Sequence, residues 1–72
     1  MRRKDKLVLW RQGARFCLRV LRYSEDPKER AQEMVDMPGM TRCVYDDFWA
    51  MGFVAMAARR AGVVVVIKKE RL

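Results

Sequence analysis

The sequence predicts a small, mostly α-helical domain that takes in the whole chain, residues 1–72, and carries one β-strand near its end. Three observations predict this fold class. Residues 48–58 contain no charged side chain, so a helix there is apolar on every side. Apolar residues in the segment 2–23 recur at intervals of three and four, which is the spacing of one helix face. Residues 63–67 are all β-branched, a composition typical of strands.

The uncharged stretch is predicted to form the core helix. A helix that is hydrophobic all round is either buried or in a membrane. Eleven uncharged residues are too few for a bilayer, which needs roughly 20. We therefore expect a buried helix over about 42–61, with Thr41 as its N-cap and Gly62 as the residue that ends it.

The first segment is predicted to be a basic amphipathic helix over about 3–23. Its apolar residues share one side of the helical wheel, and its arginines share another side, within an arc of roughly 80°. These arginines are Arg11, Arg15, Arg19 and Arg22. Gly13 is the weak point of such a helix, because glycine costs ~1 kcal/mol relative to alanine.

A β-hairpin is the alternative for residues 7–23. Its strands would be Leu7–Arg11 and Phe16–Tyr23, with the turn near Gly13. The domain would then be α+β, with the order ββααβ. The alternation expected of strands is imperfect, because residues 7–10 are apolar without a break. The regular spacing of the arginines favours the helix.

A short helix is predicted over about 27–36. Asp26 is a good N-cap, Pro27 suits the first helical position, and Glu29 can complete a capping box. The pair at 38–39, Pro-Gly, ends this helix.

The β-branched run predicts a C-terminal strand over about 63–67. A lone strand is not stable by itself. It would pair with the hairpin of the alternative fold, with its equivalent in a second copy of the chain, or with a sheet in a partner protein.

The charge is divided along the chain. Residues 1–23 have a net charge of +7, residues 24–47 a net charge of −4, and residues 48–72 a net charge of +4. The basic character therefore belongs to the two ends. This distribution suits an acidic protein surface, nucleic acid or an anionic membrane as the partner.

The cysteines and the N-terminal segment indicate in which cellular compartment the protein is expected. Cys17 and Cys43 both lie among apolar neighbours. The beginning of the chain is basic, but its apolar run, residues 7–10, is too short for a signal peptide. We therefore expect a cytoplasmic protein with buried, reduced thiols.

The composition argues against catalysis. The chain has no histidine or asparagine, one serine and one threonine, so it cannot assemble a Ser–His or Cys–His pair. Zinc sites that use histidine are excluded, two cysteines cannot complete a four-cysteine site without a second copy of the chain, and there is no glycine-rich phosphate loop. Asp46 and Asp47 would diverge by about 100° on a helix, so they are expected to form an acidic first turn. We expect no catalytic, cofactor-binding or metal-binding residue.

The sequence predicts a non-catalytic protein that binds another protein and regulates or inhibits it, as a homodimer or as a subunit on a larger protein. Very small proteins without an active site, including some made by phages, often act in this way. Arginine and tryptophan are enriched in binding hot spots, so the hypothesised partner-binding residues are Arg11, Arg15, Arg19, Arg22 and Trp10. The residues expected in the core or in a dimer interface are Trp49, Phe53, Met56, Val63 and Val65.

Two other partners remain open. Nucleic acid is the main alternative, because the four arginines can follow a phosphate backbone. An anionic membrane surface is a further alternative, because residues 2–23 form a basic amphipathic helix with aromatic side chains.

Overall fold

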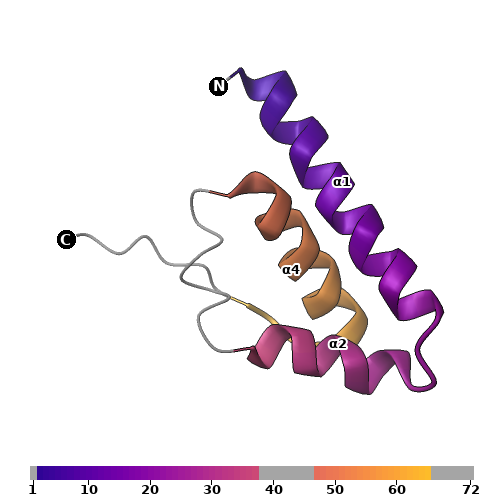
Figure 1. Ribbon diagram of the computed structural model, residues 1–72. Helices are drawn as coiled ribbons and strands as arrows, with labels where there is room; N and C mark the ends of the chain where they lie inside the picture. The colour runs from indigo at the N-terminus through magenta and orange to yellow at the C-terminus, as the bar shows by residue number, and fades with distance from the viewer. Residues whose placement is uncertain (1, 38–46, 66–72) are drawn as a thin grey trace.

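The computed structural model describes residues 2–37 and 47–65, and this part of the chain contains three helices. They are α1 (Arg3–Arg22), α2 (Pro27–Asp36) and α4 (Phe48–Ala61). In Figure 1, α4 lies alongside α1, and α2 crosses the molecule where α1 and α4 both end. The prediction of a mostly helical domain is confirmed.

Helix α1 is continuous, as the amphipathic pattern predicts. Its buried side is formed by Gly13, Ala14, Cys17 and Leu21, and its arginines lie outside. The helix ends at Tyr23, whose N–H donates to the carbonyl oxygen of Val20 at 3.3 Å. The alternative hairpin is therefore wrong, because a strand register would have buried arginine side chains in alternation with the apolar ones.

Helix α2 has the predicted bounds, 27–36, and the predicted cap. The carboxylate of Asp26 accepts a hydrogen bond from the backbone N–H of Glu29 at 3.1 Å, and Pro27 occupies the first turn. This bond satisfies one of the N–H groups that a helix start leaves free. Its buried residues, Ala31 and Met34, face the rest of the molecule.

The start of α4 differs from the prediction. Asp47 has an extended backbone, and its carboxylate accepts the N–H of Ala50 at 2.9 Å. Asp47 is therefore the N-cap, and the helix begins at Phe48 rather than near residue 42. The physical reason is that an aspartate side chain can replace the backbone acceptor of a preceding turn. The predicted cap, Thr41, lies outside the described residues.

The end of α4 is as predicted. Gly62 has φ +74°, in the left-handed region that glycine adopts at low cost. The N–H of Val63 donates to the carbonyl oxygen of Ala58 at 3.1 Å, and the N–H of Gly62 donates to that of Arg59 at 3.3 Å. This pair of bonds is the Schellman motif.

Helices α1 and α4 meet backbone to backbone at two glycines. A Cβ atom at Gly13 would overlap the carbonyl oxygen of Trp49 and lie 2.7 Å from its carbonyl carbon. A Cβ atom at Gly52 would overlap the carbonyl oxygen of Trp10 in the same way. Each helix thus presents a glycine to the other helix, and any larger residue would push the two apart.

The core is built from alanine, leucine and sulfur-containing side chains of all three helices. They are Cys17, Leu21, Ala31, Met34, Ala57 and Ala61. The large phenylalanine and methionine side chains of α4 are only partly buried. They are Phe48, Met51, Phe53 and Met56. Because the helices approach so closely, the space between them admits alanine and valine, and the large residues lie at the margins.

The predicted strand at 63–67 is described only in part. Residues 63–65 form neither a helix nor a strand, and residues 66–67 lie outside the described residues. The strand therefore stays a prediction.

No helix within residues 2–37 and 47–65 has both the length and the apolar character needed to cross a bilayer.

Candidate binding surface

The four predicted arginines form one exposed row on the outer side of α1. Arg11, Arg15, Arg19 and Arg22 are all exposed. At 1.5 Å per residue, the row runs for about 16.5 Å along the helix. Within the described residues the one ion pair is that of Arg30 and Glu33, at 3.0 Å. The row is therefore not neutralised by any carboxylate in this part of the chain. We call these four residues the arginine row.

An aromatic cluster lies beside the arginine row. The ring of Phe16 is 5.4 Å from that of Trp49 and 6.2 Å from that of Phe53, and the latter two rings stack at 5.8 Å. Such distances are typical of favourable aromatic pairs. Phe16 is nevertheless 46% exposed. It is a large apolar side chain that is held in place by its neighbours and still faces outward.

Residues of the arginine row line two surface hollows, and the aromatic cluster contributes to one of them. A hollow of about 220 Å³ is lined by Gln12, Arg15, Phe16, Arg19 and Trp49. A second hollow, of about 290 Å³, is lined by Arg15, Leu18, Arg19, Arg22 and Tyr23. Arg15 and Arg19 line both hollows, so the row has the rings of Phe16 and Trp49 at one hollow and the ring of Tyr23 at the other. We call this area, Arg15, Phe16, Arg19, Arg22, Tyr23 and Trp49, the arginine–aromatic surface.

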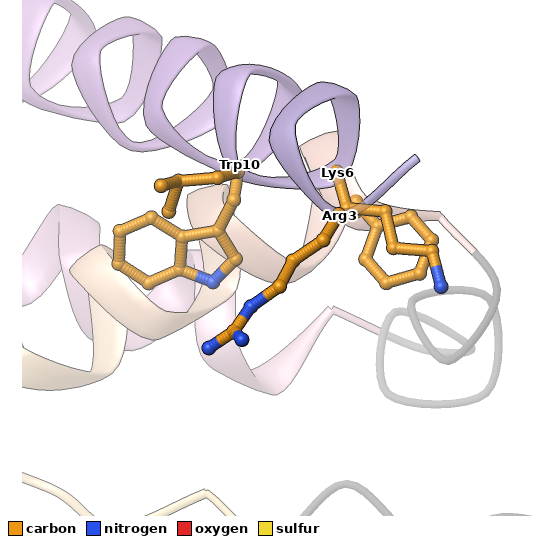
Figure 2. A pocket seen from close by; sticks show the side chains of 5 residues that line it. Arg3, Lys6 and Trp10 are labelled. Carbon is orange, nitrogen blue, oxygen red and sulfur yellow. The ribbon is translucent and has the colours of Figure 1, made fainter. Parts of the chain in front are cut away.

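Trp10 lies apart from the arginine row. It lines a groove of about 420 Å³, the N-terminal groove, together with Arg3, Lys6, Leu7 and Phe48. Figure 2 shows Arg3, Lys6 and Trp10 reaching from the same side of α1. On the helical wheel Trp10 lies opposite the arginines, on the side that turns toward α4. The structure therefore does not bring Trp10 together with the arginines.

The aromatic residues that do accompany the arginine row are Phe16 and Tyr23, which the sequence reasoning did not select. A signal for Phe16 existed: it follows Arg15 directly and precedes Arg19 by three positions, so it borders the arginine arc on the wheel. Its exposure was not readable from the sequence, because that depends on how closely α4 approaches α1.

The residues expected in a core or dimer interface fall mainly in two regions, the margin of the core and the aromatic cluster. Phe53, Met56 and Val63 pack at the margin of the core, whereas Trp49 belongs to the aromatic cluster. Val65 is half-buried. Trp49 and Phe53 link the two places, because their rings stack.

The described residues offer little reactive chemistry. Cys17 is fully buried, with its Sγ 4.0 Å from the Sδ of Met34. Burial raises the pKa of its thiol, and the nearby cation of Arg60 opposes this only in part. A neutral, buried thiol is a poor nucleophile. Among residues 2–37 and 47–65, no three histidine, cysteine or acidic side chains gather as metal ligands would. Cys43 and Asp46 lie outside the described residues.

No protein-family model matches the chain, and comparisons with curated proteins and with solved structures gave no significant match.

Proposed function

We propose that this chain is a non-catalytic cytoplasmic protein that docks on an acidic surface of a partner protein through the arginine–aromatic surface, and so regulates or inhibits that partner. One observation carries the proposal. Phe16 is 46% exposed while two aromatic rings hold it, and Arg15 and Arg19 line the hollow beside it. A preordered aromatic anchor flanked by arginines is the composition of a binding hot spot.

The arrangement suits binding because little order has to be created on contact. A flexible side chain loses about 0.5–1.5 kcal/mol of freedom when an interface immobilises it. The contacts of Phe16 with Trp49 and Phe53 reduce that cost for the aromatic anchor. The arginines supply planar donors that pair with carboxylates two bonds at a time. The partner surface is therefore expected to combine carboxylates with an apolar recess.

Self-association is part of the same proposal. Trp49 and Phe53 are half-buried and adjacent to Phe16, so a second copy can cover this area. The C-terminal strand predicted at 63–67 would then pair with its equivalent or with a sheet of the partner. Sedimentation velocity at several protein concentrations measures the oligomeric state directly. If the chain is a monomer at all concentrations, self-association is excluded, and the proposal that it acts as a subunit on a larger protein stays.

Nucleic acid is a second candidate. It is favoured by the length of the arginine row and by the lack of ion pairs between the row and described acidic residues. Four exposed arginines extend along one side of α1, and none pairs with a described acid. If they contact phosphates, affinity falls steeply with salt. The double variant Arg15→Ala plus Arg19→Ala should then lower the slope of log K against log salt by about two on duplex DNA.

Capture from an extract of the source organism separates the two candidates. The purified chain is immobilised, and the extract is applied with and without nuclease. If the target is a protein, capture survives nuclease and moderate salt, and Phe16→Ala lowers it at least tenfold. If nuclease removes all captured material, the target is nucleic acid and the protein-binding proposal fails.

A matched charge control makes the capture experiment specific. Arg15→Ala plus Arg19→Ala removes two positive charges from the proposed surface. Lys28→Ala plus Arg59→Ala removes two exposed charges from α2 and from the last turn of α4. Only the first double variant should abolish capture. Equal losses in both would mean that net charge, rather than the arginine–aromatic surface, attracts the partner.

A further inference from the structure

We propose that the N-terminal groove, with the first turns of α1 around it, is a docking site for an anionic lipid surface. This site is separate from the arginine–aromatic surface and does not depend on the function proposed above. The proposal rests on three observations: an apolar groove, a group of cations at its rim, and apolar side chains on two sides of the same helix end.

The groove is open because α1 extends beyond the start of α4, as Figure 1 shows. From Trp10 onward α4 covers the inner side of α1, and Gly52 touches the backbone of Trp10. Before that point the inner side is lined by Leu7 and by the ring of Phe48. The groove has a volume of about 420 Å³, and Leu7 remains 48% exposed.

Cations gather at this end of the molecule. Lys6 lies with its Nζ 5.1 Å from the centre of the Phe48 ring, which holds it at the rim. Figure 2 shows Arg3 reaching over the same groove. Arg2 and Lys4 are exposed on neighbouring positions. Among the described residues, 2–37 and 47–65, no acidic side chain lines the groove. Its occupant should therefore offer anionic groups next to apolar surface.

The apolar residues at this end favour a lipid surface over a peptide in the groove. Leu7 and Val8 are 48% and 44% exposed, and successive residues of a helix point about 100° apart. A peptide lying in the groove would cover Leu7 and leave Val8 in water. A lipid interface surrounds the helix end and can take up both. Trp10 completes the arrangement, because tryptophan prefers the level of the headgroups.

Vesicle pelleting tests the proposal with the full chain. The probes are vesicles of phosphatidylcholine alone and of phosphatidylcholine with phosphatidylglycerol in equal parts. We expect at least tenfold stronger partitioning to the anionic vesicles. Arg3→Gln plus Lys6→Gln should lower that partitioning at least tenfold, because the headgroup phosphates lose their partners. Absence of binding to the anionic vesicles would overturn the proposal.

Two further variants separate this site from general charge attraction. Leu7→Ser plus Val8→Ser keeps every charge and changes exposed positions, so the fold is retained; partitioning should fall at least fivefold. Lys28→Gln plus Arg59→Gln removes the same charge as the groove variant from other helices, and partitioning should change less than threefold. If the two charge variants lose binding equally, the groove is not the site.

Tryptophan fluorescence then locates the contact. The chain has two tryptophans, so Trp49→Phe leaves Trp10 as the reporter and Trp10→Phe leaves Trp49. With anionic vesicles we expect a blue shift and quenching by brominated lipid for Trp10 only. A response of Trp49 alone would place the arginine–aromatic surface, and not the groove, against the lipid, and would overturn the proposal.

Discussion

Gly13 and Gly52 show how far a single residue can decide this structure. Helix propensity alone gives glycine a cost of ~1 kcal/mol relative to alanine. In the structure each glycine lies against a carbonyl group of the opposite helix, and a Cβ atom would come within 2.7 Å of the carbonyl carbon. Glycine at either position thus lowers the stability of its own helix, but it is necessary for the close packing of α1 against α4.

Helix propensity and close packing predict changes of opposite sign in the free energy of unfolding of Gly13→Ala. Propensity predicts a gain in stability of ~1 kcal/mol. We expect instead a loss of about 3 kcal/mol, because overpacking against backbone cannot be relieved by a change of rotamer. Urea denaturation of the purified variant measures this.

Gln12→Ala is the matched control on the same helix. Gln12 is exposed, and surface substitutions usually change stability by less than about 0.5 kcal/mol. A stabilised Gly13→Ala variant would show that α1 and α4 do not approach as closely as described.

At the scale of the element, residues next to α2 and α4 specify where these helices begin or end, but not always the residue first chosen from the sequence. Asp26 caps α2 and Gly62 ends α4, as the local sequence predicts. For the start of α4, the sequence analysis chose Thr41 as the cap and placed Asp47 in an acidic first turn, although aspartate caps a helix as well as threonine does. The structure uses Asp47, whose carboxylate accepts the N–H of Ala50.

Substitution of the two candidate caps distinguishes them. We expect Asp47→Ala to lower the free energy of unfolding by about 1 kcal/mol, because the N–H of Ala50 loses its acceptor. Thr41→Ala should change it by less than about 0.5 kcal/mol. Thermal unfolding followed by circular dichroism gives both values. The reverse order would mean that the helix begins where the sequence first suggested.

At the scale of the whole molecule, the charge that the sequence divides along the chain becomes divided in space. The arginine row covers the outer side of α1, and a surface hollow at the start of α2 is lined by acids, among them Glu25 and Glu29. Like charges four positions apart on a helix repel each other. We therefore expect the arginine row to cost stability, in keeping with the binding role proposed above.

Reversing one charge in the row should separate stability from binding. Arg15→Glu replaces two repulsive pairs, with Arg11 and with Arg19, by two attractive ones. We expect the free energy of unfolding to rise by about 1 kcal/mol at low salt, while capture of the partner is lost.

Arg15→Lys is the control that keeps the charge, so its stability should match that of the unchanged chain. Urea denaturation at low and at high salt checks both variants, since the gain should shrink as salt screens the pairs. A destabilised Arg15→Glu variant would show that Arg15 supports the fold.

The sequence by itself determined the elements that depend on neighbours along the chain. The spacing of the arginines predicts α1, and the order Asp26, Pro27, Glu29 predicts α2. Local hydrogen bonds and helix periodicity act within a few residues, so they can be read from the sequence. The exposure of the arginine row was predictable for the same reason.

Only the tertiary structure decided which side chains share a surface. Trp10 was expected beside the arginines and lies in the N-terminal groove, whereas Phe16 was not selected and lies beside them. The reason is the contact of Gly13 with α4. It sets the distance between two helices that are far apart in the sequence, and that distance determines which aromatic rings are covered and which remain open.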